Sequence, residues 1–103
     1  MQHVSNGFQT FMTESGAVGS AYMEAVTKIS KASALDGKTA ELAYISVLAA
    51  ANMLGGLPFH VLSAKNLGAT REEIKSAILV GLPAVGLTVI EALPIALKSY
   101  DEN

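Results

Sequence analysis

Apolar residues along this chain recur at the three- and four-residue spacing of helices, and no convincing strand alternation is present. Residues 8–33 carry such a stripe, with charged residues on the other faces, as in an amphipathic surface helix. The stripe consists of Tyr22, Val26 and Ile29. We expect Gly16 and Gly19 to mark the start of this helix or a break before it.

Helix start and stop signals predict the next two helices. Asp36 is a suitable N-cap for a helix that runs to about Met53, where residues 54–56, Leu-Gly-Gly, end it. Pro58 suits the first turn of a fourth helix, and Gly68 closes that helix.

The strongest local signal is the sequence Thr-Arg-Glu-Glu from Thr70 to Glu73, which has the spacing of a capping box. The helix that it starts should bury one stripe. That stripe is Ile74, Ala77, Ile78, Gly81 and Leu82. Thr88 to Glu91 repeats the capping-box spacing before a last helix, which Pro94 must kink or restart. The pattern predicts an all-α bundle of about five to six helices in a single domain, residues 1–103.

Composition narrows the possible functions. The 103 residues are 50% hydrophobic and 16% charged, with a net charge of −2 and no cysteine. Without a basic patch, nucleic acid is not expected as a partner. Without cysteine, the chain has no disulfide, thiolate zinc site or thiol redox cycle of its own. The mean hydropathy of +0.39 indicates more apolar side chains than the interior of so small a chain can bury. We therefore expect either a homo-oligomer or contact with a membrane.

The membrane alternative rests on residues 42–64, a stretch without Asp, Glu, Lys or Arg that is long enough to span a bilayer. Asn52, the glycine pair 55–56 and Pro58 interrupt it, and the backbone groups freed there would lack partners in lipid. We therefore expect two shorter helices and no membrane span. The N-terminus lacks a basic region followed by an apolar core, so we expect a cytoplasmic protein.

Two residues stand out as candidates for chemistry. Glu41 heads the apolar stripe that contains Ile45 and Leu48, where a carboxylate is either a desolvated acid or base or simply turns outward at the bundle edge. On the following helix His60 lies opposite Lys65, which we expect to face water. An inward imidazole is either a proton shuttle or a core histidine satisfied by a carbonyl or hydroxyl. Two ligands are too few for a metal site, and no metal or other cofactor is expected.

The segments LDGKTAEL at 35–42 and LGATREEI at 67–74, together with His60, resemble the carboxymuconolactone decarboxylase and alkylhydroperoxidase D superfamily. The resemblance covers about Leu35 to Ile90. It implies an all-α, alkylhydroperoxidase D-like bundle built on a helical hairpin. It also implies assembly into homotrimers or homohexamers, which would hide the surplus apolar surface.

The redox branch of that superfamily uses a glutamate, a C-x-x-C pair and a histidine. In this chain Glu41 and His60 stand at the glutamate and histidine positions, whereas Met53 and Gly56 stand where the cysteines would be. Peroxide reduction and disulfide exchange need a thiolate. The chain therefore lacks the atoms of a thiol peroxidase, although the resemblance points to that activity.

The decarboxylase branch dispenses with cysteines and is implied to use a histidine on a carboxylated lactone. By this resemblance His60 and Glu41 would be catalytic, with Asn52, Met53 and Gly56 lining a substrate pocket. The only arginine, Arg71, is expected to be solvated rather than to bind a substrate carboxylate.

Three hypotheses remain open on the sequence. The first is a thiol-independent acid–base enzyme of decarboxylase or isomerase type, acting on a small, mostly apolar metabolite. The second is a relative that only binds a small molecule or assembles, with the polar pair kept as a structural hydrogen bond. The third is membrane association.

Overall fold

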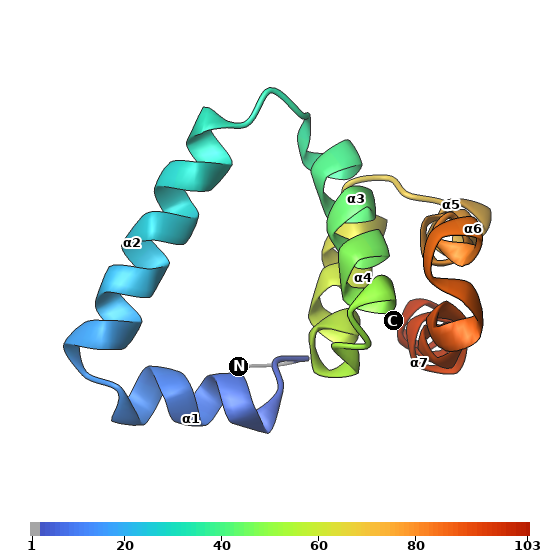
Figure 1. Cartoon of the computed structure of the whole chain (residues 1–103). Helices are drawn as coiled ribbons and strands as arrows, with labels where there is room; N and C mark the ends of the chain where they lie inside the picture. Colours follow the sequence, from blue (N-terminus) through green and yellow to red (C-terminus); the bar gives the residue numbers. More distant parts are fainter. Residues whose placement is uncertain (1–2) are drawn as a thin grey trace.

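The computed structural model describes residues 3–103, and every regular element in that range is helical (Figure 1). The elements are α1 (Asn6–Glu14), α2 (Ala17–Ala32), α3 (Gly37–Ala50), the 3-10 turn η1 (Leu54–Gly56), α4 (Leu57–Asn66), α5 (Arg71–Leu79), α6 (Leu82–Val85), the 3-10 segment η2 (Gly86–Glu91) and α7 (Ala92–Glu102). Apart from the four-residue α6, the α-helices are nine residues or longer. The all-α prediction is confirmed.

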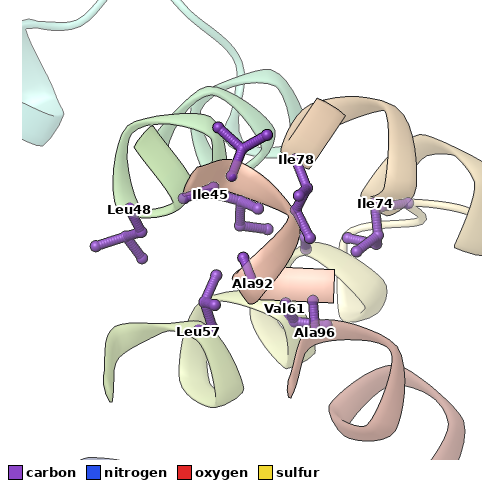
Figure 2. Close-up of a cluster of buried hydrophobic side chains, with 12 residues drawn as sticks. Ile45, Leu48, Leu57, Val61, Ile74, Ile78, Ala92 and Ala96 are labelled. Carbon is purple, nitrogen blue, oxygen red and sulfur yellow. The ribbon is translucent and has the colours of Figure 1, made fainter. Parts of the chain in front are cut away.

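The hydrophobic core lies among α3, α4, α5, η2 and α7 (Figure 2). Its largest fully buried side chains are Ile45, Leu57, Val61, Ile74, Ile78 and Val89. Small residues on α7, such as Ala92 and Ala96, let that helix approach α4 and α5 closely. The predicted stripe of α5 is confirmed at its two isoleucines, which are fully buried.

The first two helices stand apart from this core and form an arm (Figure 1). Ser5 caps α1 by accepting a hydrogen bond from the Phe8 amide, a start that the sequence analysis missed. The predicted break falls at Gly16, whose φ of +58° favours glycine. Gly19 lies inside α2 and is the only buried residue of that helix.

The predicted boundaries of α3 and α4 hold, with one shift. The Asp36 carboxylate caps α3 by accepting a 2.9 Å hydrogen bond from the Thr39 amide. The helix ends at Ala50 rather than near Met53, because Asn52 takes a left-handed conformation with φ of +57°. Pro58 lies in the first turn of α4, and Gly68, with φ of +97°, follows its end.

The capping box that starts α5 is present in both directions. Thr70 Oγ1 accepts from the Glu73 amide, and the Glu73 carboxylate accepts from the Thr70 amide. The second predicted capping box, Thr88 to Glu91, is wrong. Those residues form a 3-10 segment that runs directly into α7, so the helix begins without a side-chain cap, and Pro94 lies in its first turn.

The segment Arg71–Glu102 is long and apolar enough to cross a membrane by length and composition alone. This is weak evidence for a membrane span, because helices of soluble proteins pass the same test. The chain turns within the segment, where Gly86 has φ of +79°, and α5 packs against α7. The segment is therefore not one continuous helix.

Asp36→Asn should reduce the loss of folding stability that occurs as the pH falls. The Thr39 amide hydrogen bond lowers the pKa of Asp36 below its ordinary 3.8, so its contribution is fully present above that value and is lost as pH falls through the lowered pKa. Asparagine caps equally well but does not titrate. Urea unfolding at pH 7 and pH 3 should show a smaller acid loss in the variant than in the wild type. Equal losses would contradict the assignment.

Candidate functional site

The structure brings Glu41 and His60 into direct contact. Nδ1 of His60 lies 2.8 Å from Oε2 of Glu41, a separation that the sequence left open. Both side chains are partly buried, with 22% of Glu41 and 25% of His60 exposed. The contact joins α3 to α4, which follow one another through a short turn and lie side by side (Figure 1). We call this pair the dyad.

His60 reaches Glu41 because it lies beside the buried face of α4. That face consists of Leu57, Val61 and Ala64. The expectation that Lys65 marks the water side is wrong: its ammonium donates a 2.8 Å hydrogen bond to the Tyr100 carbonyl and lies 4.5 Å from the Tyr100 ring centroid. The aliphatic part of the lysine side chain packs against α7, and its ammonium group binds the carbonyl oxygen of Tyr100. His60 is thus turned toward α3 and not into the centre of the core.

Two aromatic rings contact the imidazole. The centroid of the Tyr44 ring lies 4.4 Å from that of His60, and the Phe59 ring lies 5.1 Å away in an edge-to-face arrangement. Neither residue was predicted from the sequence to belong to the site. Tyr44 could have been found, because it follows Glu41 by three positions and therefore shares its helix face.

The geometry defines the roles of the two imidazole nitrogens. An ionised carboxylate only accepts hydrogen bonds, so Nδ1 of a neutral His60 must carry the proton and donate it to Glu41. Nε2 then holds the lone pair, and it makes no hydrogen bond to residues 3–103. A carboxylate that fixes the tautomer in this way prepares the other nitrogen for proton transfer.

Asn52 and Met53 follow the end of α3, about 16 Å from Glu41 along the helix axis at 1.5 Å per residue, whereas Gly56 stands one turn before His60 at the start of α4. Asn52 and Met53 are exposed, and Gly56 packs against Leu48. In the described part of the chain, no side-chain hydrogen bond or ring contact joins these three residues to the dyad.

Arg71 is exposed, as predicted, but it also has a partner that the prediction did not include. Its guanidinium donates two hydrogen bonds to Asp101, at 2.9 and 3.0 Å, although both groups remain about half exposed. This pairing raises the pKa of Arg71 and lowers the pKa of Asp101. The guanidinium group of Arg71 is therefore already paired with a carboxylate near the C-terminal end of α7.

Two open hollows lie on the surface of the described chain, and neither is lined by Glu41 or His60. One, of about 460 Å³, lies beside the dyad and is lined by His3, Phe59, Leu62, Ser63, Asn66 and Leu67. The other lies between α4 and α7. Among residues 3–103, no group of three or more His, Cys, Asp or Glu side chains is placed to hold a metal ion.

Comparison with known families identifies the domain. The model of the Carboxymuconolactone decarboxylase family matches residues 16–98, most of the chain. The chain belongs to this family. No curated protein and no solved structure shows a significant match. The family assignment agrees with the resemblance at the dyad and at the start of α5, and it covers α2 as well.

The Glu41 contact should fix the tautomer of His60. In ¹⁵N NMR of the neutral imidazole, the wild type and Glu41→Gln should carry the proton on Nδ1, because a glutamine carbonyl still accepts. Glu41→Leu removes the acceptor and should shift the proton toward Nε2. Glu24→Leu, on the exposed face of α2, is the matched control and should match the wild type. An Nε2 proton in the wild type would contradict the dyad.

This family member should not reduce hydroperoxides with a thiol donor, since it has no cysteine. Turnover of tert-butyl hydroperoxide with dithiothreitol by metal-free protein would refute this expectation. The double change Met53→Cys and Gly56→Cys is compatible with the backbone, as Gly56 has φ of −84°. A β-carbon there would lie 3.1 Å from a Leu48 methyl, so that side chain must shift.

Proposed function

We propose that this family member is a thiol-independent acid–base enzyme of decarboxylase or isomerase type, with His60 as the proton-transferring group and Glu41 as its positioning partner. The observation that carries the proposal is the 2.8 Å contact between Nδ1 and the Glu41 carboxylate, which leaves Nε2 available. Membership of the carboxymuconolactone decarboxylase family supports it.

Two reactions are compatible with this geometry. In an isomerisation, Nε2 takes a proton from an acidic carbon and returns it to another carbon of the same molecule. In a decarboxylation, the protonated imidazole gives its Nε2 proton to the carbon that has lost carbon dioxide. In both, the Glu41 carboxylate stabilises the imidazolium that forms or reacts. Isomerisation returns the pair to its starting state, whereas after decarboxylation the neutral imidazole takes a proton from water before the next cycle.

The surroundings favour a small, mostly apolar substrate. Tyr44 and Phe59 border the imidazole, each with nearly half of its surface exposed. Aromatic faces bind unsaturated or cyclic carbon skeletons by packing. Arg71, the residue best suited to hold a carboxylate with two parallel hydrogen bonds, is already paired with Asp101. A single carboxylate that leaves as carbon dioxide fits such a site better than a dicarboxylate does.

The proposal is tested with a panel of carboxylated γ-lactones and their decarboxylated products, followed by carbon dioxide release and by deuterium incorporation from heavy water. Wild-type protein should turn over at least one member. His60→Ala should lower that rate by about 10²–10⁴-fold, the usual contribution of a general acid or base. The fold, followed by circular dichroism, should be unchanged because His60 is not part of the core.

His3→Ala is the matched control, since His3 is the only other histidine and makes no hydrogen bond to either dyad residue. It should retain the wild-type rate. Turnover that survives His60→Ala would overturn the assignment of His60. Binding of a panel member by wild-type protein without turnover would favour the alternative, a non-catalytic small-molecule-binding relative.

A further inference from the structure

Tyr44 places a hydroxyl group beside the dyad. It follows Glu41 by three positions on α3, and its ring centroid lies 4.4 Å from that of His60, with the two ring planes 50° apart. The residue is 44% exposed. Its hydroxyl makes no hydrogen bond within residues 3–103, so it is available to a molecule bound at the dyad.

A base alone does not complete a reaction at carbon. When a proton or carbon dioxide leaves a carbon atom, an electron pair remains on that atom. A neighbouring carbonyl group takes the pair onto its oxygen and becomes an enolate, and a hydrogen-bond donor at that oxygen stabilises the charge. The dyad supplies the proton-transferring nitrogen, Nε2 of His60. The carbonyl oxygen needs a second group.

The cationic side chains around α3 and α4 are already engaged. The ammonium of Lys38 on α3 lies 2.9 Å from the Glu73 carboxylate. Lys65 and Arg71 both bind groups of α7. In the described chain, this leaves neutral hydroxyl groups as the candidate donors for a substrate oxygen.

Two hydroxyl groups lie one helical turn from the dyad along the chain, and their surroundings differ. Ser63 follows His60 by three positions and lines a hollow with Phe59 and Leu67, which His60 does not line. The Tyr44 ring, in contrast, contacts the imidazole ring. This contact favours Tyr44 as the group that shares a bound molecule with Nε2.

The distance between the two groups suits a small carbonyl compound. With ring centroids 4.4 Å apart, the phenol oxygen of Tyr44 and Nε2 of His60 are separated by at most about 8 Å. A reacting carbon against Nε2 and a carbonyl oxygen against the phenol take up about 3 Å at each contact. The remainder is the length of the two bonds that join such a carbon to its carbonyl oxygen.

We propose that the Tyr44 hydroxyl donates a hydrogen bond to the carbonyl oxygen of the substrate, so that the site takes a small planar carbonyl compound and stabilises its enolate. The inference rests on the proposed function, for which it supplies the oxyanion donor and the substrate class. Tyr44 keeps its own proton throughout, because it stabilises charge and transfers nothing.

Isomerisation of a β,γ-unsaturated carbonyl compound illustrates the role of this donor. Nε2 takes a proton from the carbon between the alkene and the carbonyl. The C–H electron pair forms a new carbon–carbon double bond, and the carbonyl π pair moves onto the oxygen that Tyr44 binds. The oxygen pair then re-forms the carbonyl, while the far alkene carbon takes the proton from Nε2. The product is the α,β-unsaturated isomer.

Decarboxylation uses the same oxygen when the carboxylate stands on the carbon next to the carbonyl. The bond to the carboxylate breaks, carbon dioxide leaves, and the electron pair moves through a new double bond onto the oxygen at Tyr44. The enolate carbon then takes the Nε2 proton of the imidazolium, and the oxygen pair re-forms the carbonyl. Both reactions therefore need the same donor.

Binding of an enolate mimic tests the donor without turnover. 4-Nitrophenolate is planar and carries an oxyanion, whereas 4-nitroanisole has the same ring without one. In titration calorimetry at a pH where the phenol is ionised, wild-type protein should bind 4-nitrophenolate. Tyr44→Phe keeps the ring and should weaken this binding by about 10–100-fold, the usual effect of losing one hydrogen bond to a charged group. Both proteins should bind 4-nitroanisole equally.

Tyr22→Phe is the matched control, because the Tyr22 ring packs against Phe11 on the arm instead of the imidazole. It should bind 4-nitrophenolate as the wild type does, and so should Ser63→Ala, which removes the other hydroxyl. The proposal is overturned if the wild type does not bind 4-nitrophenolate, if Tyr44→Phe binds it equally well, or if Ser63→Ala causes the loss.

Kinetic measurements separate this inference from the proposed function. On a panel member that turns over, Tyr44→Phe should lower kcat by about 10²–10³-fold, as for the loss of one oxyanion donor, with a smaller change in KM. Phenolate binding that depends on Tyr44, without turnover of any panel member, would refute the acid–base enzyme and leave the oxyanion site. An unchanged kcat in Tyr44→Phe would refute the oxyanion site and leave the enzyme.

Discussion

The packing of α3 against α4 is the constraint on which the rest of this structure depends. Ile45 and Leu48 on α3 join Leu57 and Val61 on α4 in one buried cluster, which sets the two helices side by side. The Ser46 hydroxyl then anchors α3 to α5 by donating a 2.6 Å hydrogen bond to the Ala77 carbonyl. With the helices fixed in this way, the two polar side chains at their edge meet, and the imidazole takes a defined orientation.

Much of this fold could be predicted from the sequence because its helix ends are encoded locally. The Asp36 cap, the proline in the first turn of α4 and the capping box at Thr70 each act within one turn of the chain. The family resemblance likewise rests on local strings, and it singled out Glu41 and His60. The failed capping box at Thr88 shows the limit of this reasoning, because spacing alone does not exclude a 3-10 segment.

The features that could not be predicted from the sequence depend on contacts between distant segments of the chain. The direction of Lys65 was mistaken because its partner, Tyr100, lies 35 residues away on α7. The same holds for Arg71 and Asp101, and for the ring of Phe59 at the dyad. The surplus of apolar residues was visible in the composition, but only the structure shows where the exposed ones lie, among them a row on α2, the rings of Tyr44 and Phe59 beside the dyad, and several residues between Val80 and Ile90.

The contact between Glu41 and His60 should make the two side chains act as one unit. A double-mutant cycle in urea unfolding, with Glu41→Ala, His60→Ala and the double variant, tests it without any substrate. The two changes should be coupled by about 0.5–3 kcal/mol, as for residues in direct contact. Free energies of unfolding that add to within about 0.3 kcal/mol would contradict it, because they would show that the two side chains do not interact.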